Sequence, residues 1–99
     1  MYNYAGRIVE ARAGRDKGKL FYVVGVDQDT FRLLLADGKG RRAERPKAKK
    51  LGHVSCMTTE DTPFPHPVTQ ALSQGEAVTN RELRRALAAF KEEMRLGKR

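Results

Sequence analysis

Aromatic residues are scarce in this chain of 99 residues: it has four phenylalanines, three tyrosines and no tryptophan. Proteins that bind unpaired nucleic acid without sequence preference stack its bases on exposed rings. The composition therefore argues against a stacking platform of this kind. The length is that of one domain, which can bury only a modest core.

Cysteine is nearly absent too, because Cys56 is the only one, and this excludes an internal disulfide. A structural zinc site needs four ligands, usually in close pairs, and beside Cys56 the chain offers only His53 and His66. A catalytic Cys–His pair also needs a third group that orients the base, and the sequence supplies none. We therefore expect no metal, no cofactor, no small-molecule substrate and no enzymatic activity.

Long apolar runs are missing as well. No segment approaches the roughly 18 to 20 apolar residues of a membrane span, and the N-terminal MYNYAGRIVEA lacks the basic-then-apolar layout of a signal peptide. The expectation is a soluble, cytoplasmic protein that does not insert into a membrane.

Positive charge is abundant, with 20 Lys and Arg against 12 Asp and Glu, a net charge of +8 and a pI of about 10.1. The charge is uneven: residues 1–52 hold 13 basic against 6 acidic residues, and residues 53–99 hold 7 against 6. A basic surface of this kind favours nucleic acid or an anionic membrane surface as partner.

One basic stretch joins two apolar runs of β type within residues 6–26. Glycine reaches positive φ without a steric clash, so Gly14 and Gly18 allow a tight reversal between the runs. Asp16 can hold the shape of this turn through hydrogen bonds. The cations beside the glycines would project into water or onto a polyanion: Arg15, Lys17 and Lys19. A hairpin loop that merely solubilises the protein is the alternative.

A second basic stretch covers residues 39–50, where Glu44 is the only acid. Like charges at this density repel one another, and binding to a phosphate backbone relieves the repulsion. The alternative is a solvated loop. The stretch contains seven candidate RNA contacts: Lys39, Arg41, Arg42, Arg45, Lys47, Lys49 and Lys50.

Hydrophobic patterning predicts strands at residues 6–12, 20–26, 31–36 and 53–57, with a further extended segment at 41–45. Residues 20–26 are apolar on both parities, so that strand needs a cover on each face. Gly25 indicates either a bulge in it or a close approach of another backbone. Asp37-Gly38, followed by Gly40, predicts a hairpin after the third strand.

The C-terminal half reads differently, because three prolines within residues 58–67 predict an extended linker. A short helix is predicted over residues 67–75, with proline in its first turn and glycine at its end. A longer helix is predicted at about 80–96, opened by a capping box of Thr79 and Glu82. Its apolar stripe could pack on the strand at 20–26 or dock on a partner: Leu83, Leu87, Phe90 and Met94.

A family resemblance joins these features. The residues Gly6, Val9, Gly14, Asp16, Lys17, Gly18, Val23 and Val24 resemble the KOW motif. The stretch AGRDKGKLFYVVGV followed by LLLADGKGRRAERPKAKKLGH is similar to KOW proteins of the large ribosomal subunit of archaea and eukaryotes and to their small bacterial relatives. The resemblance covers about residues 4–53, and weakly the helix VTNRELRRALAAFK.

The resemblance implies an SH3-like small barrel. Together with the patterns above, we expect a mainly β protein with this barrel at residues 1–57, and the proline-rich linker and helical appendage at 58–99. The resemblance further implies a non-enzymatic, ribosome-associated protein that binds large-subunit rRNA through its two basic loops. The C-terminal helix could contact ribosomal proteins. The alternative is a KOW module that binds proteins of the transcription or translation machinery.

Overall fold

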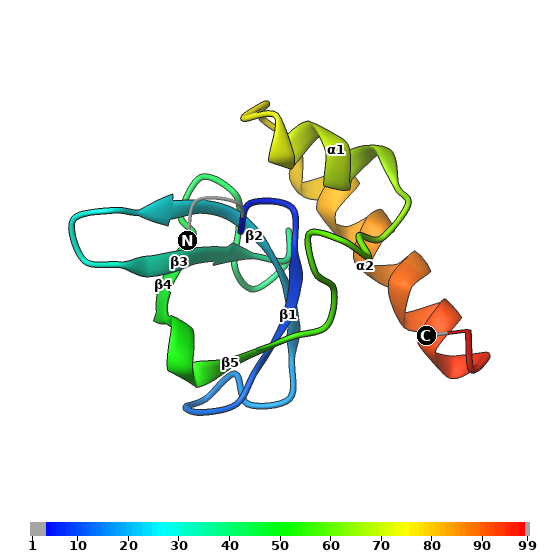
Figure 1. Ribbon diagram of the computed structural model, residues 1–99, viewed down its shortest axis with the longest axis horizontal. Helices are drawn as coiled ribbons and strands as arrows, with labels where there is room; N and C mark the ends of the chain where they lie inside the picture. Colours follow the sequence, from blue (N-terminus) through cyan, green and yellow to red (C-terminus); the bar gives the residue numbers. More distant parts are fainter. Residues whose placement is uncertain (1–3, 99) are drawn as a thin grey trace.

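The protein has a mixed α/β architecture, in which a five-stranded antiparallel sheet is followed by two helices. The computed structural model describes residues 4–98 (Figure 1), so the outer limits of the two predicted regions, residues 1 and 99, lie outside it. The strands have the spatial order β4-β3-β2-β1-β5. Their bounds are β1 Ile8–Ala11, β2 Leu20–Asp27, β3 Arg32–Ala36, β4 Lys47–Lys50 and β5 Val54–Cys56.

Strand β2 is buried on both faces, as its sequence predicts. Phe21 and Val23 join the core on one face of the sheet, together with Val9, Leu33 and other apolar residues. Tyr22 points to the opposite face, into a core formed with the helices. The two apolar parities of β2 therefore supply two cores. A register shift against β3 between Val23 and Gly25 confirms the predicted bulge.

The helices cover one face of the sheet (Figure 1). They are α1, Pro67–Ser73, and α2, Asn80–Arg95. The predicted stripe of α2 packs on Tyr22 and Ile8, with Leu83, Leu87 and Phe90 buried; the fourth member, Met94, remains 37% exposed. The helix thus packs within the chain on the strand that needed a cover.

Both helix starts agree with their sequence signals. Pro67 is the first residue of α1, and the Thr79–Glu82 capping box is complete, with both reciprocal hydrogen bonds formed. Because the Thr79 N–H donates to the Glu82 carboxylate, the pKa of Glu82 lies below its usual value.

The extended segment predicted at residues 41–45 is wrong. The backbone turns there instead, and the strand begins at Lys47, after Pro46. The physical reason lies in the backbone donors: Asp37 Oδ1 accepts the Arg41 N–H at 2.9 Å, and Asn80 Oδ1 accepts the Ala43 N–H at 2.7 Å. These side chains take the donors that a strand ladder would have used.

The predicted linker at 58–67 contains no strand or helix before Pro67, yet it is fastened to the fold. The hydroxyl of Thr58 accepts the Ile8 N–H at 3.0 Å. Phe64 is 3% exposed and packs edge-on against Phe90. The segment therefore ties the sheet to the helices.

The sheet is open in its hydrogen bonding: within residues 4–98, β4 and β5 are its edges and no strand pairing closes a barrel. A 3-10 turn, η1 (Leu51–His53), connects the two edge strands directly. Over the same residues, neither helix has the length and apolar character needed to cross a membrane.

Candidate nucleic-acid interface

Loop 1, residues 12–19, connects β1 to β2 in the tight reversal that its glycines predict. Gly14 has a φ of 81° and Gly18 a φ of 89°, both in the left-handed region. Within the loop, the Lys17 N–H donates to the Gly14 carbonyl and the Lys19 N–H to the Asp16 carbonyl. This backbone frame leaves the side chains of Arg15, Lys17 and Lys19 exposed.

Asp16 has a role that the sequence did not indicate. Its side chain accepts hydrogen bonds from Nε and Nη2 of Arg41 at 3.2 and 3.0 Å. Arg41 belongs to loop 2, residues 37–46, so this ion pair joins the two basic loops. Lys19 Nζ lies 3.6 Å from the other carboxylate oxygen. The acid holds the loops together instead of capping its own turn.

The surroundings of Asp16 favour its charged form. Burial raises the pKa of this carboxyl, but the hydrogen bonds and charge of Arg41, with the charges of Lys19 and Lys47, outweigh the burial, so that the pKa lies below its usual value. Asp16 is therefore ionised at neutral pH and holds Arg41 electrostatically.

A second contact joins the basic stretches. Lys49, on β4, is 9% exposed, and its Nζ donates to the carbonyl oxygen of Ala13 at 2.8 Å. The ammonium group also lies 3.1 Å from the point where a Cβ on Gly14 would stand. Lys49 thus stabilises loop 1 and is not part of the exposed basic surface.

Loop 2 is held from its other side by α2. Arg84 Nη1 donates to the Gly38 carbonyl at 2.7 Å, and Asn80 Nδ2 donates to Glu44 at 2.6 Å. Gly38 has a φ of 78°, and a Cβ there would come within 2.2 Å of the Asn80 carbonyl oxygen. Loop 2 therefore lies directly on the start of the helix, which fixes its shape.

The remaining candidate contacts divide by exposure. Arg41 and Lys47 are half-buried beside Asp16, and Arg42 is exposed and forms a surface ion pair with Glu44 at 3.5 Å. The others are exposed side chains without an ion pair in the part of the chain that the structure describes: Arg15, Lys17, Lys39, Arg45 and Lys50. We call the exposed cations of loops 1 and 2, which the Asp16–Arg41 pair joins, the basic surface.

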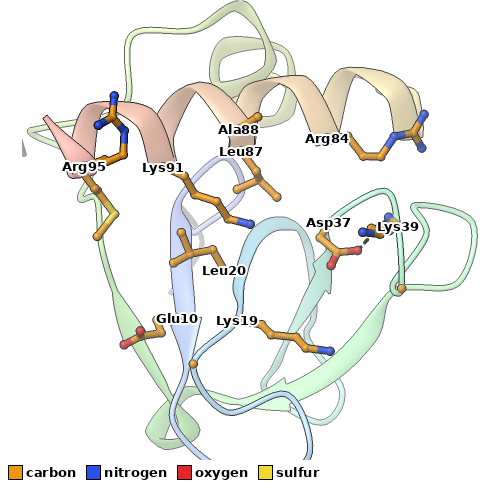
Figure 2. Close-up of a pocket in the computed structure, with 13 residues that line it drawn as sticks. Glu10, Lys19, Leu20, Asp37, Lys39, Arg84, Leu87, Ala88, Lys91 and Arg95 are labelled. Atoms are coloured by element: carbon orange, nitrogen blue, oxygen red, sulfur yellow. Dashed lines mark hydrogen bonds between the residues drawn. The ribbon is translucent and has the colours of Figure 1, made fainter.

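A groove of about 940 Å³ opens beside this surface, between α2 and the two loops (Figure 2). Its lining includes Lys19 from loop 1, Lys39 from loop 2 and Lys91 from α2. Leu20 and Leu87 form its apolar floor. Lys91 was not identified from the sequence, because the contact between α2 and the loops is a tertiary feature.

The three residues weighed for metal or catalytic chemistry lie in different settings. His66 opens α1, where its Nδ1 accepts the Val68 N–H at 3.1 Å. His53 is exposed in η1, and Cys56 is exposed on β5. Residues 4–98 contain no group of three or more His, Cys, Asp or Glu side chains that could hold a metal ion.

In comparisons with known proteins, no protein-family model matches the chain, and no curated protein matches it significantly.

Proposed function

We propose that this protein binds folded RNA without catalysing a reaction, using loops 1 and 2 as one phosphate-binding surface. The observation that carries the proposal is the Asp16–Arg41 pair, which brings cations of two distant sequence stretches together. Arginines of the surface can bind phosphates bidentately, while its lysines act as point charges. Because ion pairs and glycine turns already fix the backbone of the two loops, the loops lose little conformational entropy when they bind RNA, which favours affinity.

For the fold, we propose that the five-stranded sheet is an SH3-like barrel of the KOW type whose two edge strands stay unpaired. Three features support this: the strand order, the short η1 turn between the edge strands, and the bulge at Gly25, which allows β2 to bend. The resemblance of residues 4–53 to KOW proteins points the same way.

The resemblance also suggests which RNA is bound. We propose rRNA of the large ribosomal subunit, and therefore a cytoplasmic, ribosome-associated protein whose α2 helix could contact ribosomal proteins as well. The apolar stripe of α2 is already used inside the chain, so such contacts would fall on the polar side of the helix.

The experiment is a salt titration of binding to a fluorescently labelled fragment of large-subunit rRNA. If roughly five to eight phosphates are neutralised, the logarithm of the affinity should fall against the logarithm of salt with a slope of about −4 to −7. An affinity that does not change with salt would contradict phosphate binding and favour a protein-binding KOW module of the transcription or translation machinery.

A further inference from the structure

The groove between α2 and the loops has cations on both walls. Lys39 and Lys91 carry no ion pair within residues 4–98, and Lys19 has only its 3.6 Å contact with Asp16. Figure 2 shows Lys91 extending from the helix toward Leu20, with Lys19 across the opening. Three lysines from three separate elements thus line one space.

The other charged groups of the lining are already used or lie at its edge. Arg84 holds the Gly38 carbonyl, and Arg95 pairs with Glu92 on the helix surface. Asp37 Oδ1 accepts two backbone N–H groups of loop 2. Glu10 lies on the side of the groove away from Lys39 (Figure 2). Five basic residues against two carboxylates line the groove, so its lining is net positive, which favours an anionic occupant.

Among residues 4–98, the apolar residues that line the groove include no aromatic ring: Leu20, Leu87, Ala88 and Met94. In a duplex the bases stack inside the helix, and phosphates face outward, so a paired strand would leave this floor uncovered. An unpaired strand can place its riboses and base edges on the floor and its phosphates near the lysines. Binding there would depend on phosphate contacts, which carry no base-sequence information, and not on a stacking platform.

We propose that this groove binds a short single-stranded segment of RNA that continues from the structured RNA on loops 1 and 2. The inference rests on the proposed function, because Lys19 and Lys39 belong to both the loop surface and the groove. It makes α2 a third RNA-binding element, with Lys91 as its phosphate contact. The bound RNA would then contain a junction between paired and unpaired strands.

The test compares two labelled RNAs: a fragment of large-subunit rRNA folded as a hairpin, and the same hairpin with a short oligo-uridine tail. Lys91→Glu probes the groove, and Arg85→Glu is the matched control, since Arg85 is exposed on the same helix outside the groove and gives the same change in net charge. Lys17→Glu probes loop 1 outside the groove. Circular dichroism checks that each variant folds.

For the wild type and Arg85→Glu, the tail should tighten binding about five- to tenfold, roughly one favourable contact. Lys91→Glu should remove this gain and bind the bare hairpin as Arg85→Glu does. Lys17→Glu should weaken binding of both RNAs and keep the gain.

Two outcomes would overturn the inference while leaving the proposed function intact: a tail without effect on the wild type, or a gain that Lys91→Glu retains. A third outcome would assign the groove to a protein partner and also overturn the inference. In that outcome, an acidic, partly apolar peptide binds in a way that depends on Lys91, while binding of the RNA tail does not depend on Lys91. Failure of the bare hairpin to bind any form of the protein would instead contradict the proposed function.

Discussion

Asp16 and Arg41 are 25 residues apart in the chain, yet the Asp16 carboxylate accepts two hydrogen bonds from the Arg41 guanidinium. The acid is 7% exposed, so the pair is largely shielded on one side. This contact holds loop 1 and loop 2 next to each other. The basic surface is thus a product of tertiary structure, beyond the average charge of the sequence.

A double-mutant cycle measures this contact. We expect Asp16→Asn and Arg41→Met each to destabilise the fold, with a coupling of about 1 kcal/mol or less, because Arg41 is partly exposed and solvent weakens the pair. Urea unfolding of the wild type, both single variants and the double variant gives the coupling. Strictly additive effects would show that the pair does not hold the loops together.

The lowered pKa of Asp16 predicts a pH dependence of stability. Ionisation of Asp16 is more favourable in the folded state than in the unfolded state, so the charged carboxylate stabilises the fold. This stabilisation is complete above about pH 5. It is lost as the pH falls, first through the pKa of Asp16 in the unfolded state and then through its lower pKa in the folded state. The difference in unfolding free energy between the wild type and Asp16→Asn should therefore shrink below about pH 4. Glu82 is present in both proteins, so its own lowered pKa cancels in the difference. A difference that stays constant down to pH 3 would contradict the assignment.

Lys49 and Lys50 are neighbours with different surroundings, because Lys49 is buried against loop 1 and Lys50 is exposed. Variants of the two residues therefore distinguish a structural role from a surface charge. Lys49→Met leaves the Ala13 carbonyl without its charged donor and should cost about 1 to 2 kcal/mol. Lys50→Met, at an exposed position, should change stability by less than about 0.5 kcal/mol. Thermal and urea unfolding of the two variants would decide, and equal stabilities would argue against the buried contact.

Gly38 and Gly18 form a matched pair for the contact between loop 2 and α2. Both have positive φ, but only Gly38 lacks room for a Cβ, while nothing lies within 4 Å of the corresponding point at Gly18. Gly18→Ala should cost about 1 kcal/mol of backbone strain, whereas Gly38→Ala should cost about 3 kcal/mol or more because the loop must leave the helix. Urea unfolding measures both, and similar costs would mean that loop 2 does not lie on α2.

The parts of this fold that local chemistry dictates could be predicted from the sequence. The capping box at Thr79, the two loop glycines and the doubly apolar strand β2 each carry a local signal, and the structure confirms all three. The failure at residues 41–45 has a partly long-range cause, because Asn80 takes a backbone donor there from 37 residues away, beside the local contact of Asp37 with Arg41.

The candidate site divides in the same way. Charge density identified both basic stretches, but it could not tell exposed Lys50 from buried Lys49 on one short strand. Side chains alternate between the two faces of β4, so Lys49 is buried and Lys50 is exposed. The sequence KAKK does not show which face is buried, because three of its four residues are lysines. Lys91 was not singled out, since its position opposite Lys19 depends on how α2 packs on the sheet.

The most direct test of the account reverses charges on the two loops separately and together. Lys17 and Arg45 suit this test, because they are exposed and the described chain shows no ion pair at either. Binding of labelled large-subunit rRNA is measured over a salt series for Lys17→Glu, Arg45→Glu, the double variant and the Arg85→Glu control. We predict that each loop variant lowers the affinity and flattens the salt slope by about one unit, that the double variant does both further, and that the control does neither. Affinities and slopes equal to those of the wild type in folded loop variants would contradict the account.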